Sequence, residues 1–290
     1  MAVGREIITR IRSVQSTEKI TKAMQMVSTS KMRKTQERMR AARPYADKVR
    51  EVIAHLAQAE TAVELPMMRC PTEIKRAGFI LITADKGLCG GLNTNSLKVF
   101  FSKVHEYKSQ GIGVDICALG SKGLAACQRA QLNVAASAVQ LGDTPKMERL
   151  IGALRVLMSK FTAGEIDVVH IVYTRFINTM RQEPTIEQLL PLKTGEIIES
   201  ATVFQQQYVY EPDPNTVLDF LLRRYTESIL YQAVCDNMAS EQAARMVAMK
   251  AATDNAGNTI KQLQLQYNKS RQAAITTELT EICAGAAAVS

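Results

Sequence analysis

Two glycine-rich stretches hold the residues whose types and spacing could bind a phosphate. DKGLCGG spans residues 85–91 and GSKG spans residues 120–123, and each follows a short apolar run. A glycine-rich turn between a strand and a helix can cradle phosphate on its backbone N–H groups. Neither stretch contains the GK[ST] of a Walker A loop, and GxGxxG is absent from the sequence. We interpret both as tight turns or protein-contact loops, with nucleotide binding as the alternative.

The remaining reactive residue types form no catalytic pattern. None of the three histidines, His55, His105 and His170, lies in a recognisable nucleophile motif, so we expect satisfied or solvent-facing side chains. The carboxylates are scattered. The six cysteines include no CxxC pair, and no histidine lies at a zinc-ligand spacing from them. We therefore expect reduced cysteines in a cytosolic protein, and no catalytic residue, cofactor or metal site.

Positive charge is concentrated at the N-terminal end of the chain. The 290 residues have a formal net charge of +8, yet residues 1–50 alone hold 13 Lys or Arg against 4 Asp or Glu. Such a segment favours an acidic partner, although a basic run is usually a solvated face. Nucleic acid is the less favoured partner, because the chain has no Trp and the segment has no aromatic residue before Tyr45. The basic cluster comprises Lys31, Arg33, Lys34, Arg38, Arg40 and Arg43.

The distribution of proline and glycine indicates which elements carry these residues. All eight prolines lie within residues 44–214, and twelve of the fifteen glycines lie within residues 78–195. Residues 5–43 contain neither breaker, and residues 215–290 contain only two glycines. Stretches of this kind predict long helices at both ends of the chain. No run is long and apolar enough for a transmembrane helix, and we expect no signal peptide.

Both end segments show a seam that is typical of coiled coils. In the C-terminal segment, nine residues follow a 3,4 alternation, although several are small or polar: Met246, Met249, Thr253, Ala256, Ile260, Leu263, Tyr267, Ser270 and Ala274. The N-terminal seam is looser and comprises Ile7, Ile11, Val14, Ile20, Met24 and Val27. An antiparallel coil within one chain is the economical arrangement, and a parallel homodimer is the alternative.

The middle of the chain has a different pattern. GFILITAD, GVDICALG and VVHIVYTRF are short, β-branched apolar runs, separated by segments of helical period. This alternation predicts a parallel sheet with covering helices. We therefore predict a helix-rich α+β fold. An N-terminal coiled-coil helix (1–60) pairs with a C-terminal one (210–290), and a Rossmann-like α/β domain (75–200) lies between them in sequence.

Three long motifs together resemble one protein family. They are SVQSTEKITKAMQMVSTSKMRK near the start, DKGLCGGLN in the middle, and SEQAARMVAMKAATDNA with YNKSRQAAITTELTEI near the end. In this order they resemble the gamma subunit of the F-type ATP synthase, over essentially the whole chain. The resemblance implies a non-catalytic central rotor shaft without cofactors. Such a shaft turns inside a ring of three alpha and three beta subunits and rests on the membrane c-ring, so it couples proton translocation to ATP synthesis or hydrolysis.

The resemblance also assigns contact residues, which no spacing argument supplies. Two residues in YVYEPD, Tyr208 and Glu211, match the foot that meets the c-ring and the epsilon subunit. The positions that match contacts with the beta subunit are Met24, Lys31, Lys86, Cys89, Arg245, Arg271, Gln272 and Thr276.

The same resemblance suggests a location. The chain lacks the insertion and the close cysteine pair that photosynthetic relatives carry, and it starts directly with the shaft helix. We therefore expect a bacterial protein that is peripheral at the cytoplasmic face of the inner membrane, held there only through the c-ring. Two rival functions remain at this point. One is a basic coiled coil that binds nucleic acid or an anionic membrane, and the other is an enzyme built on the middle domain.

Overall fold

Two long helices begin and end the described part of the chain. The computed structural model describes residues 2–58, 67, 71, 73–192 and 214–289. Helix α1 runs over Ala2–Gln58 and helix α6 over Pro214–Val289, as the lack of breakers predicted. Pro44 lies inside α1 without ending it. The chain divides into two compact units, which are residues 1–29 with 245–290, and residues 30–244.

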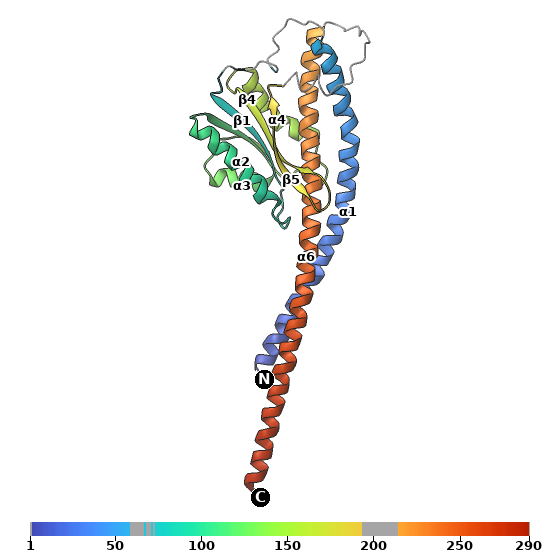
Figure 1. Ribbon diagram of the computed structural model, residues 1–290, viewed down its shortest axis with the longest axis vertical. Coiled ribbons are helices and arrows are strands. Elements are labelled where there is room, and N and C mark those ends of the chain that lie inside the picture. Colours follow the sequence, from blue (N-terminus) through green and yellow to red (C-terminus); the bar gives the residue numbers. More distant parts are fainter. Residues whose placement is uncertain (1, 59–66, 68–70, 72, 193–213, 290) are drawn as a thin grey trace. The chain divides into compact units, whose positions relative to one another are not determined.

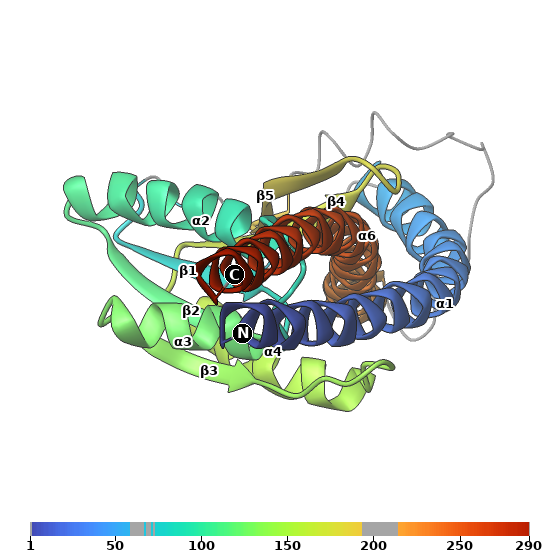
Figure 2. The same cartoon turned by 90° about the horizontal axis from the view of Figure 1, so that it is seen from below.

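The first unit is an antiparallel pair of helices. Figure 1 shows the N- and C-terminal ends of the chain toward the same end of this unit, so α1 and α6 run in opposite directions within it, and Figure 2 views both helices from that end. The hydroxyl groups of Thr21 and Thr253 lie 2.7 Å apart across the seam. The predicted antiparallel coil within one chain is therefore confirmed.

The seam itself differs in part from the prediction. On α6, eight of the nine predicted residues are buried or half-buried, and only Ala274 is exposed. On α1, Ile20 and Val27 were predicted in the seam, and that was wrong, because they are 60% and 54% exposed. The buried positions there are Thr21 and Ser28. Thr21 and Ser28 follow Ile7 and Val14 at steps of seven residues and so lie on the same face of the helix, whereas Ile20 and Val27 are each one residue out of this register.

The last turns of α6 extend without a covering element. Residues 271–287 are exposed on every side of the helix. They include the apolar side chains of Ile275, Leu279 and Ile282, each about half exposed or more. None of the helices that the structure describes is long and apolar enough to cross a lipid bilayer.

The second unit contains a five-stranded sheet. Its strands are β1 (Arg76–Ile82), β2 (Gly113–Leu119), β3 (Val134–Ala138), β4 (Val168–Phe176) and β5 (Gln182–Leu190), in the order β3-β2-β1-β4-β5. The three predicted strands are β1, β2 and β4, which pair in parallel as expected. The edge strand β5 pairs antiparallel to β4, so the sheet is mixed rather than wholly parallel. The tight hairpin at residues 177–181 allows this, since antiparallel neighbours need no crossover helix.

Helices cover both faces of the sheet (Figure 1). Helices α2 (Leu92–Ser109) and α3 (Ser121–Arg129) lie on one face, where Phe100 and Val104 pack against Phe79 and Val172. Helix α4 (Met147–Thr162) and residues 214–244 of α6 lie on the other, where Leu150 packs into a second apolar cluster. Strand β1 is buried on both faces, which explains its uninterrupted apolar sequence.

Side chains of α6 complete the end of strand β4. Strand β1 pairs with β4 only as far as Leu81 and Val172, so β4 extends beyond its neighbour. There the backbone N–H of Thr174 donates to the side-chain oxygen of Asn237 at 3.3 Å, and Ser240 donates to the Thr174 carbonyl at 3.1 Å. Both helix residues are buried. The helix therefore satisfies backbone groups that a further strand would otherwise satisfy.

Candidate partner-binding surface

The glycine-rich loop 85–91 is organised by one carboxylate. Asp85 accepts hydrogen bonds from the backbone N–H groups of Ser121, Gln140 and Leu141 at 2.8–2.9 Å, and from the Ser121 hydroxyl at 2.8 Å. Burial raises the pKa of Asp85, but these hydrogen bonds outweigh it and hold that pKa below its usual value. The carboxylate thus joins the loops that follow β1, β2 and β3.

The second glycine-rich stretch owes its glycines to close packing. Gly120 has φ +100°, and a Cβ placed on it would lie 2.1 Å from the carbonyl oxygen of Thr83. The hydroxyl of Thr83 in turn accepts a hydrogen bond of 2.8 Å from the backbone N–H of Gly123. Only glycine tolerates both this backbone angle and this contact. These glycines hold the loop against the end of β1.

This geometry argues against nucleotide binding at the start of α3. In a doubly wound sheet, a phosphate binds beyond the carboxyl ends of the strands, on the first N–H groups of a helix. Here the N–H of Ser121, the first residue of α3, already donates to Asp85. An internal carboxylate therefore lies where the anion of a nucleotide would be held, which supports the interpretation of the loop as a protein-contact element.

Three residues of this loop differ in their exposure. Lys86 is exposed, and Leu88 is 62% exposed. Cys89 is only 2% exposed, and its sulfur accepts a hydrogen bond of 3.2 Å from Asn93. Lys86 and Leu88 therefore lie on the surface of the loop, while Cys89 supports it from within.

The basic cluster of α1 is partly used by the chain itself. Lys31 makes an ion pair with Asp143 at 2.8 Å, and Arg38, two turns along the same face, donates to the Asp143 carbonyl oxygen. Arg33 pairs with Glu37 along the helix at 3.3 Å. Two cations therefore bind α1 to the loop between β3 and α4, and only the rest of the described cluster, Lys34 and Arg40 foremost, is exposed for an acidic partner.

The other residues assigned by resemblance lie on α1 and α6 or outside the described residues. Met24 is half-buried, and Arg245 is buried with 8% of its surface exposed. Tyr208 and Glu211 lie outside the described residues. Arg271, Gln272 and Thr276 are exposed on the projecting end of α6.

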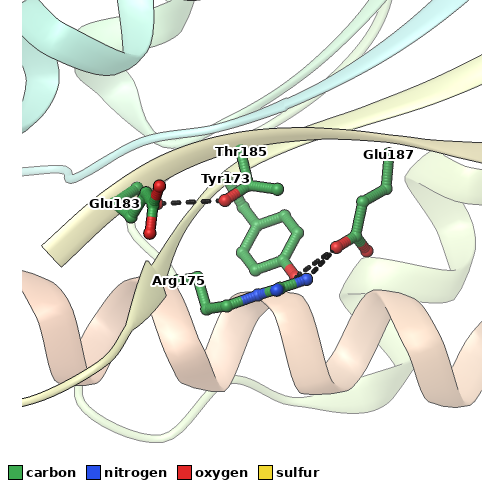
Figure 3. A network of polar contacts seen from close by, with 5 residues as sticks. All are labelled: Tyr173, Arg175, Glu183, Thr185 and Glu187. Atoms are coloured by element: carbon green, nitrogen blue, oxygen red, sulfur yellow. Dashed lines mark hydrogen bonds and ion pairs between the residues drawn. The ribbon is translucent and has the colours of Figure 1, made fainter.

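A polar network joins the two strands at the edge of the sheet (Figure 3). The hydroxyl of Tyr173 donates to Glu187 at 3.2 Å, and Arg175 forms an ion pair with the same carboxylate. Burial raises the pKa of Tyr173 to about 12, so its phenol stays protonated at neutral pH. Because the three side chains come from the paired strands β4 and β5, the network fixes the position of the edge strand rather than forming a reactive site.

The described residues contain no catalytic arrangement. His170 is buried, its Nε2 lies 2.7 Å from the Tyr107 hydroxyl, and burial lowers its pKa to about 4, so it is a neutral core residue. The expectation of a fully satisfied side chain was wrong in part, because no hydrogen bond to its Nδ1 is found among the described residues. His105 is exposed on α2, and the side chain of His55 lies outside those described. No group of metal-ligating side chains occurs among the residues that were placed. Cys89, Cys117, Cys127, Cys235 and Cys283 are free thiols, and Cys70 lies outside the described residues.

Sequence reasoning missed two features of this surface. Leu88 was not singled out, although an apolar residue inside a glycine-rich polar loop is an available signal. Asp143 was also missed, because nothing local distinguishes an acidic residue that pairs with cations more than a hundred positions away.

The fold and its surfaces define a class of protein. The two chain ends form a coiled coil, an α/β domain lies between them in sequence, and the surfaces suit protein contact. Together these features define a structural subunit of a larger assembly.

Comparisons with known proteins show to which family of such subunits this chain belongs. A family model described as ATP synthase matches residues 4–289. The ATP synthase gamma chain of Chromobacterium violaceum is 68% identical over 289 residues, which cover 100% of both chains. That of Neisseria meningitidis serogroup C is 66% identical over 291 residues, again covering 100% of each. The chain belongs to the ATP synthase gamma chain family.

Solved structures agree with this membership. The central stalk and c-ring structure of the Tetrahymena thermophila mitochondrial ATP synthase matches with a TM-score of 0.57 and 26% identity, over 80% of this chain and 99% of that one. The rotor of the Euglena gracilis mitochondrial ATP synthase shares the fold, with a TM-score of 0.65 and 20% identity, over 94% and 99% of the two chains. As a family member, this chain is a central-stalk subunit of an enzyme complex, peripheral to the membrane that holds the complex.

Proposed function

We propose that this chain is the non-catalytic shaft that transmits torque between the membrane c-ring and the catalytic alpha and beta subunits. The observation that carries the proposal is the projecting end of α6, which exposes Ile275, Leu279 and Ile282. Apolar side chains spread along an uncovered helix are expected to be covered in the assembled protein. A surrounding ring of subunits is the partner that can cover such a helix on every side.

The seam of the coil is consistent with this role. Small and polar residues such as Thr21, Ser28 and Ala256 occupy its buried positions, so the two helices can approach closely. Torque applied at one end is transmitted only if the helices resist sliding past each other, and the hydroxyl pair of Thr21 and Thr253 opposes such sliding. The division into a coiled coil (1–60 with 210–290) and a central domain (75–200) belongs to this proposal.

The contacts form the finer part of the proposal. The beta subunit meets Met24 and Lys31 of α1, Lys86 and Cys89 of the loop after β1, and Arg245, Arg271, Gln272 and Thr276 of α6. Within this chain Lys31 is half-buried and Cys89 and Arg245 are buried, so these three contribute chiefly through the elements that carry them. Tyr208 and Glu211 meet the c-ring and the epsilon subunit. The complex works at the cytoplasmic face of a bacterial inner membrane.

Reconstitution tests the function directly. The chain is mixed with separately purified alpha and beta subunits, the native mass of the product is measured, and MgATP hydrolysis is assayed. We expect one copy of the chain with three alpha and three beta subunits, and turnover that depends on its presence. A chain that stays outside the complex, or enters it without changing turnover, contradicts the proposal. Saturable binding of duplex DNA or of a nucleotide by the chain alone would favour one of the rival functions instead.

A further inference from the structure

The loop between β3 and α4 is fixed from the side of the sheet by two charged residues. Asp85 accepts hydrogen bonds from the N–H groups of Gln140 and Leu141, at 2.9 and 2.8 Å. Arg149 of α4 donates to the carbonyl oxygens of Gln140 and Val139, at 3.0 and 2.8 Å. Gln140 has φ +55°, a left-handed angle that is unfavourable for a residue other than glycine. A loop that four hydrogen bonds hold in such a conformation is a rigid point of attachment.

Helix α1 is attached to this loop at two points on one face. The Lys31 ammonium lies 2.9 and 2.8 Å from the two carboxylate oxygens of Asp143, and Arg38 donates to the carbonyl oxygen of Asp143. Lys31 and Arg38 are seven residues apart and so lie on the same side of the helix. Apolar packing, which is non-directional, is scarce here, because Thr35 is the only buried side chain within residues 31–38. The two polar contacts therefore fix the rotation of α1 about its own axis.

These contacts lie where α1 leaves the unit that contains the sheet. This unit comprises residues 30–244, and the chain passes from it to the other unit only within α1 and α6. On α1, Lys31 is the second residue of the unit. On α6, Ser240 lies one turn before the end of the unit, and it is bonded to Thr174 there. Each long helix is thus tied to the α/β domain close to its exit, so torque that is carried along the chain between the units passes through these ties.

The two ties differ in strength. Ser240 and Thr174 are buried, whereas the side chains of Lys31 and Asp143 are 37% and 64% exposed. An exposed ion pair is weak, and salt screens it. Its loss changes the ratio of attached to released α1 by up to about fivefold. The tie of α1 can therefore be opened without unfolding the protein.

We propose that Asp143 is a positioning residue that acts through Lys31 and holds α1 at a fixed rotation against the α/β domain, so that the two shaft helices turn together. The proposal rests on the shaft function, and it concerns a contact within this chain rather than a contact with another subunit. Without the carboxylate, α1 rolls against the loop between β3 and α4. Part of the work done on the shaft is then lost in that movement when the shaft turns under load.

Distance measurements on the complete chain test the position of α1. Nitroxide labels are attached through Glu37→Cys on α1 and Val156→Cys on α4, because both positions are exposed and lie in the unit of residues 30–244. Cys70→Ser and Cys283→Ser remove two further thiols, and the other four cysteines are buried. Pulsed EPR then gives the distribution of distances between the two labels.

Three variants are compared in this labelled background. Asp143→Asn removes the charge at nearly constant size, and Asp143→Glu retains the charge. The matched control is Glu148→Gln, which removes an exposed carboxylate of α4 that forms no ion pair with any residue in the described ranges. The denaturation midpoint of each chain is measured alongside.

We expect the labelled background to give a narrow distribution that broadens at high salt, because salt screens the ion pair. Asp143→Asn should give the broad distribution at low and high salt alike, with a denaturation midpoint close to that of the control. Asp143→Glu and Glu148→Gln should behave as the background does. A distribution for Asp143→Asn that matches the background, or a large fall in its denaturation midpoint, overturns the proposal.

The complete complex in membrane vesicles shows the consequence for the shaft. We expect Asp143→Asn to support MgATP hydrolysis but to transport fewer protons for each ATP hydrolysed than Glu148→Gln does. Equal ratios of protons to ATP in these two variants contradict the role of Asp143 in the shaft. If the unsubstituted chain neither assembles nor supports hydrolysis, the shaft function itself fails, and the EPR measurement still decides whether Asp143 positions α1.

Discussion

The hydroxyl of Ser240 on α6 donates a hydrogen bond of 3.1 Å to the carbonyl oxygen of Thr174 at the end of β4. Both residues are buried, and Asn237 accepts from the N–H of the same threonine. A shaft helix is thereby joined to the α/β domain through backbone groups rather than through side chains alone. Rotation of one without the other would leave these buried groups unsatisfied.

Removing this joint should destabilise the protein. Ser240→Ala leaves the Thr174 carbonyl without its donor, and we expect a loss of about 1–3 kcal/mol in the free energy of unfolding. Urea denaturation of the complete chain measures this loss. Ser102→Ala, at an exposed position of α2, is the control and should change stability by less than about 0.5 kcal/mol. Equal free energies of unfolding for Ser240→Ala and Ser102→Ala would show that the hydrogen bond from Ser240 does not stabilise the protein.

Asp85 should be essential for the shape of its loop. Asp85→Ala removes the acceptor of three backbone N–H groups, so we expect it to cost about 2–4 kcal/mol, because several donors lose their partner together. Amide hydrogen exchange at Ser121, Gln140 and Leu141 would report the loss locally. Asp219→Ala, at a surface ion pair on α6, serves as the control. Unchanged exchange at the three amides in Asp85→Ala would refute this account.

Stability should fall in acid through Asp115. Burial raises the pKa of this carboxyl, but hydrogen bonds from Lys160 and Asn133 outweigh it, so the folded-state pKa lies below the ordinary value of 3.8. The carboxylate therefore contributes stability above the unfolded-state pKa, and that contribution is lost as pH falls through the folded-state pKa. Denaturation midpoints measured from about pH 6 downward should fall less steeply for Asp115→Asn than for the wild type. Parallel curves would show that Asp115 is not the titrating group.

Thiol reactivity should separate one cysteine from the rest. Burial raises the pKa of Cys117 to about 12 and those of Cys127 and Cys235 to about 11, and Cys89 is buried, whereas Cys283 is exposed. A chain carrying Cys70→Ser should therefore show one fast thiol towards a thiol-reactive dye, and the others only after denaturation. Cys283→Ser should abolish the fast phase. A second fast thiol would contradict the burial of the other four.

The corrected seam of the coil makes a further prediction. Ile260→Ala, in a buried seam position, should lower the free energy of unfolding by about 1–3 kcal/mol. Ile20→Ala, on the exposed face of α1, should change it by less than about 0.5 kcal/mol. Circular dichroism during denaturation compares the two. A larger loss of stability in Ile20→Ala than in Ile260→Ala would show that Ile20 does belong to the seam.

The sequence alone determined the elements whose pattern is local. The scarcity of proline and glycine predicted α1 and α6, and the 3,4 alternation of Met249, Ala256 and Ile260 predicted the seam of α6. The apolar runs predicted β1, β2 and β4, because strands buried on both faces carry continuous apolar residues. Long motifs identified the family, which no periodicity could do.

Only the tertiary structure decided which residues meet across large separations in sequence. It pairs Lys31 with Asp143, joins Ser240 to Thr174, and turns β5 antiparallel at the edge of the sheet. It also exposes Ile20 and buries Thr21, and it places the carboxylate of Asp85 at the anion position at the start of α3. These outcomes depend on the packing of whole elements, whose free energy is shared among distant residues and leaves no local trace in the sequence.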